Sequence, residues 1–233
     1  MMRSNKQQGV ALVLVLWITL LMTVIAGSFA LSARTEYMQS RIVFGSTQAR
    51  FIAEAGLNLA VFQLRNPDPE SRWIPDGRVQ EFELEGAKIE IKVTDESGKI
   101  DINRANEELL MGLFASVGIE FDDAIGMADK VMDWKDADEE VRLAGAEDDD
   151  YFSAGYKYGA KDAPFDSVPE LVQVMDIDYE TYLKLEPAIT VYSGRDNINL
   201  GFAPKEALMA IDGINAEMAD EFISQRHEID AIS

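Results

Sequence analysis

The chain has 233 residues, a formal net charge of −21 and no cysteine. Its length allows a membrane anchor with one or two small domains, and a hydrophobic content of 47% is sufficient for a core. The acidic residues concentrate after residue 67, so the surface repels nucleic acid and anionic lipid and attracts divalent cations. The absence of cysteine excludes a disulfide framework and thiol catalysis.

An uncharged stretch covers residues 10–33 and is bounded by Arg34. At about 1.5 Å per residue it predicts a helix long enough to cross a hydrocarbon core of roughly 30 Å. Beyond Arg34 the pattern becomes amphipathic, so we expect one continuous helix that runs from the membrane into solvent. A short polar leader with Arg3 and Lys6 precedes it and ends at Gly9.

Three interpretations of this N-terminus remain open from the leader alone. A cleaved secretory signal could be cut near residues 26–28, although the apolar run is longer than such signals need. A signal anchor would keep Arg3 and Lys6 in the cytoplasm. A type IV pilin-like leader would be cut between Gly9 and Val10, and the helix would be retained. The fifth residue after that cut is Leu14, where a pilin normally has glutamate.

The next segments predict a helix followed by a hairpin. Apolar residues recur at helical spacing through residues 35–65, and three prolines within residues 66–78 end the helix. Residues 79–84 and 87–93 alternate as strands, with Glu85 and Gly86 at the turn. We therefore expect an antiparallel hairpin with one face on the helix.

After Thr94 the pattern becomes mainly helical. Asn106 is the expected N-cap of one helix, residues 122–134 predict a second, and short helices are expected at 167–175, 179–185 and from Pro204. A strand is expected at 188–192. Residues 98–113 and 196–211 resemble each other, which indicates two related small helical units.

The second unit has the pattern of a helix-hairpin-helix around Gly213. In nucleic-acid binders such a hairpin presents backbone amides to phosphate beside lysine and arginine. The acids around Gly213 are Asp212, Glu217, Asp220 and Glu221. We therefore expect no nucleic acid partner. The motif instead indicates a module in which the two helices pack together. The alternative function is a signal-anchored periplasmic binding protein that uses this unit for a ligand or DNA.

The acidic segment between residues 133 and 151 is the best candidate for chemistry. Counted from Asp136, acids occupy positions one, three, five and twelve of an EF-hand loop, but position six is Val141 instead of glycine. The segment is therefore either an irregular calcium loop or a solvated acidic loop, and composition does not decide. The single histidine, His227, has no partner pattern, and no glycine-rich phosphate loop is present. We therefore expect that the protein is not an enzyme.

Several motifs in one order resemble the K-type minor pseudopilin of the type II secretion system, the GspK family. The matching stretches are QQGVALVLVLW at 7–17, DESGKIDINRA at 95–105, DWKDAD with GAEDDDY at 133–151, SVPELVQV at 167–174, and the repeated IN motif at 198–203. The resemblance covers essentially the whole chain. Members of the family lack the glutamate at the fifth mature position, in agreement with Leu14.

The resemblance implies an α+β fold with a pilin-like long N-terminal transmembrane helix, an antiparallel sheet, and a large inserted all-α domain that is SAM-like or helix-hairpin-helix-like. The expected parts are a leader at 1–9, the helix at 10–66, the hairpin at 67–100, a first helical unit at 101–187, a strand returning to the sheet at 188–196, and a second helical unit at 197–233. Family members usually continue to a closing strand, so the completeness of the sheet stays open.

The resemblance also implies structural calcium in the helical part. The ligands it suggests are Asp133, Asp136, Asp138, Glu147 and Asp148. The implied partners are the prepilin peptidase, which would cut between Gly9 and Val10 before methylation of Val10, the inner-membrane secretion platform, and the I and J types of minor pseudopilin. The expected role is a non-enzymatic subunit at the pseudopilus tip, anchored by a single pass in the bacterial inner membrane with its bulk in the periplasm, for protein export across the outer membrane.

Overall fold

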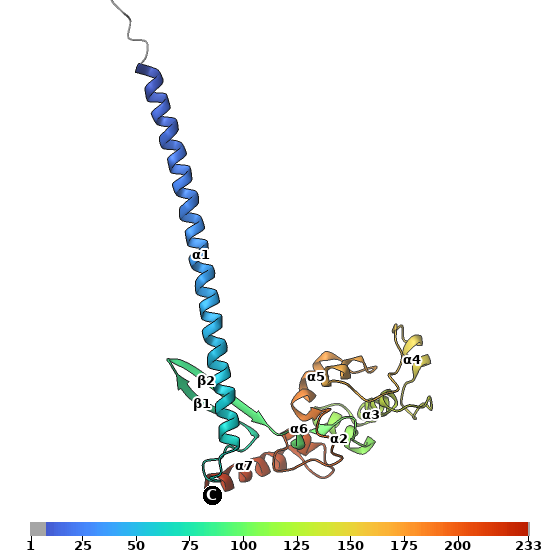
Figure 1. Cartoon of the computed structure of the whole chain (residues 1–233). Helices are drawn as coiled ribbons and strands as arrows, with labels where there is room; N and C mark the ends of the chain where they lie inside the picture. The colour runs from blue at the N-terminus through green and yellow to red at the C-terminus, as the bar shows by residue number, and fades with distance from the viewer. Residues whose placement is uncertain (1–7, 233) are drawn as a thin grey trace, which may run out of the picture. The chain divides into compact units, whose positions relative to one another are not determined.

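The computed structural model describes residues 8–232, with side-chain environments for residues 10–226. Its elements are α1 (Gln8–Leu64), β1 (Asp76–Leu84), β2 (Ala87–Thr94), η1 (Glu96–Gly98), β3 (Ile100–Asp101), α2 (Glu107–Ser116), α3 (Phe121–Lys135), α4 (Asp148–Ser153), η2 (Val168–Gln173), α5 (Tyr179–Leu185), η3 (Glu186–Ala188), β4 (Ile189–Thr190), α6 (Lys205–Met209) and α7 (Ala216–Ile232) (Figure 1). Most of the expected leader, residues 1–7, and the side chain of His227 lie outside the described residues.

The chain divides into two compact units. One contains Met1–Asn58 with Glu83–Ile89, and the other contains Leu59–Phe82 with Glu90–Ser233. The helix α1 is continuous over 57 residues, and most of it lies in the first unit. This continuity confirms the predicted helix that runs from the apolar stretch into the amphipathic stretch.

The strands β1 and β2 form a two-stranded sheet joined by a tight turn. Glu85 and Gly86 both have positive φ, at 51° and 79°. Two consecutive positive φ values are typical of the turn that matches the right-handed twist of a hairpin. The predicted hairpin and its turn are therefore confirmed.

The expected strand at 188–196 pairs differently from the prediction. Only Ile189–Thr190 is strand, and it lies parallel to Ile100–Asp101 in a separate two-stranded sheet. The predicted return to the hairpin sheet is therefore wrong in this structure. The reason lies in burial: Ile100 and Ile189 are both about fully buried, at 1% exposure, so the pair closes the core of the helical region.

The helical region has one contiguous apolar core. Leu110, Leu113 and Phe114 of α2, with Val131 and Trp134 of α3, are buried in it. The predicted cap is confirmed, since Asn106 Oδ1 accepts a hydrogen bond from the Leu109 N–H at 2.9 Å. The segment predicted as helix at 167–175 is a 3₁₀ helix over Val168–Gln173.

The two segments that echo each other in sequence contact each other in the fold. The Asn199 N–H donates to the Ser97 carbonyl at 2.8 Å, and α2 packs on α6. Gly98 lies so close to the backbone of Phe202 that a Cβ would come within 2.4 Å of it. The internal repeat therefore corresponds to two packed helical hairpins, α2–α3 and α6–α7.

Candidate functional site

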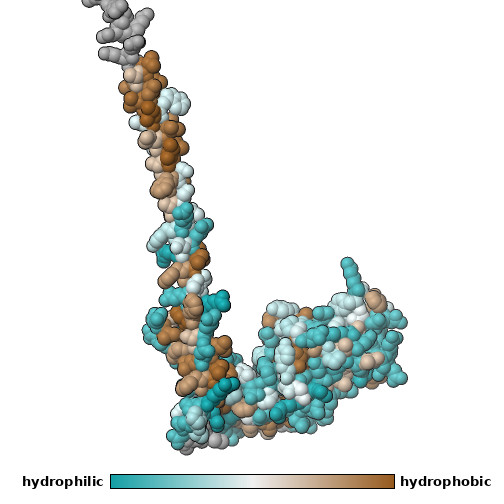
Figure 2. Space-filling view, viewed as in Figure 1, coloured by the Kyte–Doolittle hydropathy of each residue, from teal (hydrophilic) through white to brown (hydrophobic). Residues whose placement is uncertain are grey.

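The N-terminal part of α1 has the properties of a membrane segment. Among the described residues, one helix, Val10–Leu64, contains a window long and apolar enough to cross a membrane, with a mean hydropathy of 2.6. None of that window is buried inside the protein, and Figure 2 shows its hydrophobic surface. A stretch with so much exposed apolar area is stable in lipid or against other subunits, so α1 is a candidate membrane anchor. Gly9 and Val10, the expected cleavage position, lie in its first turn.

Apolar side chains also lie on the surface of the later part of α1. Phe44 is 72% exposed and Phe51 is 64% exposed. Together with Ile52 and Leu84 they line a groove of about 470 Å³ within the first unit. Exposed aromatic side chains at helical spacing are typical of a surface that another helix covers.

The acidic segment surrounds the C-terminal end of α3. Asp133 lies in the last turns of α3 and is fully buried. Its Oδ1 contacts Arg142 Nη1 at 2.5 Å, and its Oδ2 accepts hydrogen bonds from the backbone N–H groups of Arg142 and Ala146, at 3.2 and 3.0 Å. Burial raises the pKa of Asp133, and the Arg142 guanidinium opposes this by stabilising the charged form.

Two carboxylate oxygens in this segment are buried without a partner. They are Asp136 Oδ1 and Glu147 Oε1. The other oxygen of Asp136 contacts Arg142 Nη1 at 2.6 Å. Burial, together with the negative charges of Asp133 and Asp136, raises the pKa of Glu147 to about 7. A buried acceptor without a donor costs free energy, and these two oxygens carry that cost in the folded chain.

The remaining suggested ligands lie at the edge of this cluster. Asp138 is exposed, and its Oδ1 accepts a hydrogen bond from the Glu140 N–H at 3.0 Å, although its charge acts on Glu147. Asp148 is exposed at the start of α4 and lies against Gly159, where a Cβ would meet its carboxylate. The structure therefore brings Asp133, Asp136, Asp138 and Glu147 into one region, with Asp148 beside them.

Sequence reasoning missed three participants. Asp129 is buried in α3, and its Oδ2 accepts a hydrogen bond from the Ala144 N–H at 3.0 Å. Asp162 is distant in sequence but its charge acts on Glu147. Arg142 supplies the internal cation. The helical spacing of Asp129 and Asp133, four residues apart on one face of α3, was the available signal for the first of these.

An aromatic cluster supports the acidic segment. Trp134 packs on Tyr151 and Phe165 with ring centroids 5.7 and 6.3 Å apart. The fully buried Tyr151 accepts a hydrogen bond at its hydroxyl oxygen from the Met175 N–H at 3.0 Å, and burial raises its pKa. Trp134 Nε1 also donates to Glu170 Oε1 at 3.3 Å. These contacts hold the two ends of the acidic segment, at α3 and α4, in fixed positions.

The carboxylates of the acidic segment are suitable ligands for a hard divalent cation by their chemistry, but their positions do not form a metal site. Carboxylate oxygens are the donors that calcium prefers, and two of them lack a partner while buried. Yet in the described part of the chain no group of three or more histidine, cysteine, aspartate or glutamate side chains is placed to hold a metal ion. Arg142 supplies the compensating charge instead.

Comparisons with known proteins agree with this architecture. The family described as "Type II secretion system (T2SS), protein K" matches residues 87–194. Type II secretion system protein K of Klebsiella pneumoniae is 25% identical, covering 89% of this chain and 70% of that protein. The Pseudomonas aeruginosa protein K is 24% identical, covering 94% of this chain and 72% of that protein.

A solved structure shares the fold. It is the GspK-GspI-GspJ complex from the type II secretion system of enterotoxigenic Escherichia coli, with a TM-score of 0.51 and 19% identity, covering 76% of this chain and 67% of that chain. With its long apolar N-terminal helix, small two-stranded sheet and mainly helical region, this chain has a pilin-like fold similar to that of the solved chain. Over residues 87–194 the chain is similar to the type II secretion system protein K family, and the curated relatives that carry this name match it over most of its length.

Proposed function

We propose that this chain occupies the tip of the pseudopilus, together with the I and J types of minor pseudopilin, and caps or initiates its assembly for export across the outer membrane. The observation that carries the proposal is α1, whose apolar side chains are exposed from Val10 to Phe51. The similar solved chain is part of a complex with GspI and GspJ. The remaining helical region is bulky and could not repeat along a tightly packed fibre, which supports an end position.

The absence of a carboxylate at Leu14 also supports an end position. In a growing fibre, a glutamate there would be buried in apolar surroundings unless it met the N-terminal amine of another subunit. A subunit with leucine at this position has no such pairing to complete. The inserted helical region, which we propose to be SAM-like or helix-hairpin-helix-like, would then face outward from the tip.

The proposal includes a route to the tip. The prepilin peptidase cuts between Gly9 and Val10, Val10 is methylated, and α1 rests in the inner membrane at the secretion platform until assembly. The remaining chain lies in the periplasm. Arg3 and Lys6 on the cytoplasmic side support this orientation.

The processing step is tested by mass spectrometry of the membrane-expressed chain with and without a prepilin peptidase. We expect loss of residues 1–9 only when the peptidase is active. The Gly9→Val variant should remain uncut, whereas a Gly27→Ala variant should be processed normally, since Gly27 has open space around it. An intact N-terminus in the presence of active peptidase would mean that the segment is a signal anchor and not a pilin-like leader.

The tip role is tested by co-purification with the I and J types. We expect the three subunits to elute as one complex of equal amounts. The Phe51→Glu variant should lose this complex because it places a charge on the exposed aromatic surface of α1. The Phe29→Glu variant places the same charge within the membrane stretch. It therefore shows what failed insertion looks like, as distinct from failed association. Retention of the complex by Phe51→Glu would contradict the role proposed for this surface.

We also propose that the acidic segment binds structural calcium through Asp133, Asp136, Asp138, Glu147 and Asp148. The two unpartnered buried oxygens support this proposal. Calcium would supply positive charge between α3 and α4 and hold the segment folded. Thermal melts with calcium and with chelator should differ by several degrees, roughly what 1–2 kcal/mol of binding free energy gives in a chain of this size.

Matched variants make the calcium test specific. Asp136→Asn combined with Glu147→Gln should abolish the calcium shift. Asp149→Asn, an exposed change in the same segment at a residue outside the proposed ligand set, should keep it. Equal melting temperatures of the unmodified chain in calcium and in chelator would contradict the proposed calcium site.

A further inference from the structure

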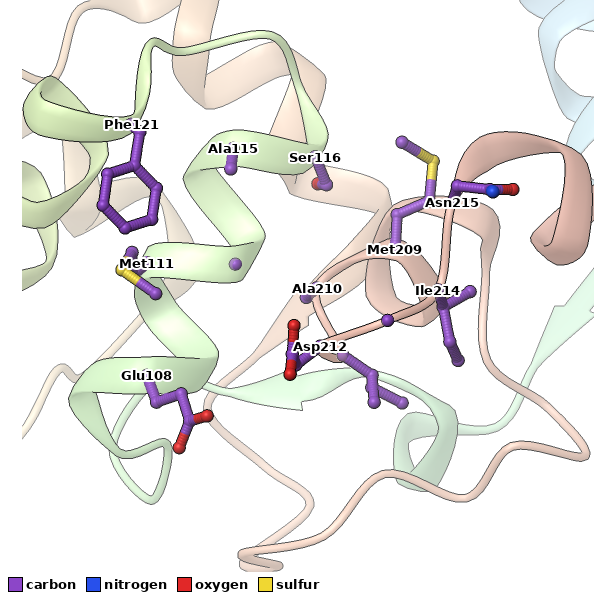
Figure 3. Close-up of a pocket in the computed structure, with 13 residues that line it drawn as sticks. Glu108, Met111, Ala115, Ser116, Phe121, Met209, Ala210, Asp212, Ile214 and Asn215 are labelled. Atoms are coloured by element: carbon purple, nitrogen blue, oxygen red, sulfur yellow. The ribbon is translucent and has the colours of Figure 1, made fainter.

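A groove of about 730 Å³ lies between α2 and the turn that joins α6 to α7. Figure 3 shows Met111, Ala115 and Phe121 on one side and the turn that carries Asp212 on the other. Apolar side chains from both sides line it, namely Met111, Ala115, Phe121, Met209, Ile211 and Ile214. Phe121 is 60% exposed. We call this feature the α2–α6 groove.

The packing of the two helical hairpins makes the groove a fixed feature. At its floor, Gly112 lies against the Ala210 carbonyl so closely that a Cβ would come within 2.0 Å of that oxygen. The turn then leaves α6 through Gly213, whose φ of 82° favours glycine. The two backbones are thus in close contact at the floor of the groove, which holds its two sides together.

Two carboxylates border the apolar surface. Glu108 and Asp212 both line the groove, from α2 and from the turn. Neither has a hydrogen bond or ion pair with another residue of the described chain. None of the groove-lining residues is a lysine or arginine. The groove therefore combines an apolar floor with uncompensated negative charge at its edge.

We propose that the α2–α6 groove binds an amphipathic segment of a partner protein that presents large apolar side chains beside lysine or arginine. Charge complementarity selects this partner over an acidic or nucleic acid partner, which the carboxylates repel. Apolar grooves are surfaces on which an amphipathic helix lays its apolar face. The inference goes beyond the tip role, because this groove lies in the helical region and not on α1.

The test measures binding of a dye-labelled synthetic helical peptide of leucine and lysine to the full chain in nanodiscs of neutral lipid, by fluorescence anisotropy, with empty nanodiscs as the blank. A peptide with glutamate in place of lysine is the charge-reversed probe. The Glu108→Gln/Asp212→Asn variant removes both carboxylates. The Glu70→Gln/Asp196→Asn variant removes the same charge from exposed positions that do not line the groove.

We expect the lysine peptide to bind and the glutamate peptide not to bind. Because exposed ion pairs are individually weak, Glu108→Gln/Asp212→Asn should weaken binding roughly three- to tenfold. The control variant should bind as the unmodified chain does. Ala115→Trp fills the groove from an exposed helical position, so it should weaken binding at least as much without a change in the melting of the chain.

Three results would overturn the proposal. The first is equal weakening in the control variant, which would mean binding to net charge alone. The second is unchanged binding to Ala115→Trp. The third is concentration-dependent self-association that Ala115→Trp abolishes, since the occupant would then be a second copy of this chain.

Discussion

The apolar residues of α1 and those of the helical region are stabilised in different ways. In α1, aromatic and aliphatic side chains such as Trp17 and Phe44 are 68% and 72% exposed. In the helical region, residues such as Leu113 and Phe114 are 1% exposed. The helical region buries its apolar surface within the chain, whereas α1 requires lipid or other subunits to cover its own. A substitution should therefore affect folding in one region and insertion or assembly in the other.

The largest expected difference is between two phenylalanines. Phe114→Ala removes a ring from the core and should destabilise the helical region by about 3–5 kcal/mol. Phe51→Ala should change unfolding by less than about 0.5 kcal/mol because the ring is 64% exposed. Thermal melts of the full chain in detergent measure both. Similar losses from the two changes would mean that α1 and the core unfold as one unit.

Two glycine substitutions sharpen the comparison. Gly112→Ala places a Cβ within 2.0 Å of the Ala210 carbonyl oxygen and should cost about 1–3 kcal/mol, as overpacking does. Gly45→Ala in α1 meets nothing within 4 Å, so it should leave stability unchanged or slightly raised.

A control within the helical region separates crowding from a general intolerance of change. Gly126→Ala in α3 meets its nearest neighbours, the Cβ and carbonyl oxygen of Ala144, at 3.8 Å, which is ordinary contact. Since alanine favours a helix over glycine by about 1 kcal/mol, this variant should be as stable as the original or more so. A loss as large as that of Gly112→Ala would mean that the helical region tolerates no change at its glycines, and that crowding against Ala210 is not the cause of the Gly112→Ala loss.

Glu147 makes the stability of the helical region depend on pH. Its pKa is about 7 in the folded chain, above the ordinary value of 4.5, so the folded state holds the proton more tightly than the unfolded state. Its contribution is therefore complete below pH 4.5 and is lost as the pH rises through 7. In chelator at pH 8, Glu147→Gln should melt a few degrees higher than the original chain.

The same variant reverses its effect if calcium binds. With calcium present, removal of the Glu147 charge should lower the melting temperature, because a ligand is lost. Exposed Asp149→Asn provides the comparison in both solutions. If Glu147→Gln melted below the original chain in chelator at pH 8, the raised pKa would be contradicted.

The smallest expected effects distinguish a cap from a surface ion pair. Asn106→Ala removes the hydrogen bond to the Leu109 N–H and should cost about 1 kcal/mol. Arg50→Ala in α1 removes an exposed pair with Glu54 and should cost roughly 0.3 kcal/mol or less. Denaturant unfolding should detect the loss of stability in Asn106→Ala, whereas the loss in Arg50→Ala should be too small to detect. A larger cost for Arg50→Ala would mean that the solvent-exposed part of α1 contributes to the stability of the folded chain.

The sequence alone determined the features that depend on local patterns. The uncharged run from Val10 predicted the long helix, Glu85 and Gly86 predicted the hairpin turn, and Asn106 predicted a helix start. Each depends on the length of an apolar run, on backbone conformations that few residues adopt, or on one side chain next to free N–H groups. The ordered set of motifs also predicted the similarity to type II secretion system protein K that the comparisons found.

Tertiary structure decided which distant residues meet. Ile189 was expected beside the hairpin but pairs with Ile100, since burial of both in the helical core outweighs the preference of a short strand for a larger sheet. The sequence could not show that Arg142 lies between Asp133 and Asp136, or that Asp162 approaches Glu147. It also could not show the α2–α6 groove, which exists because Gly112 admits the Ala210 carbonyl. Such contacts join residues separated by many positions in the chain, and only the packing of the core fixes their distances.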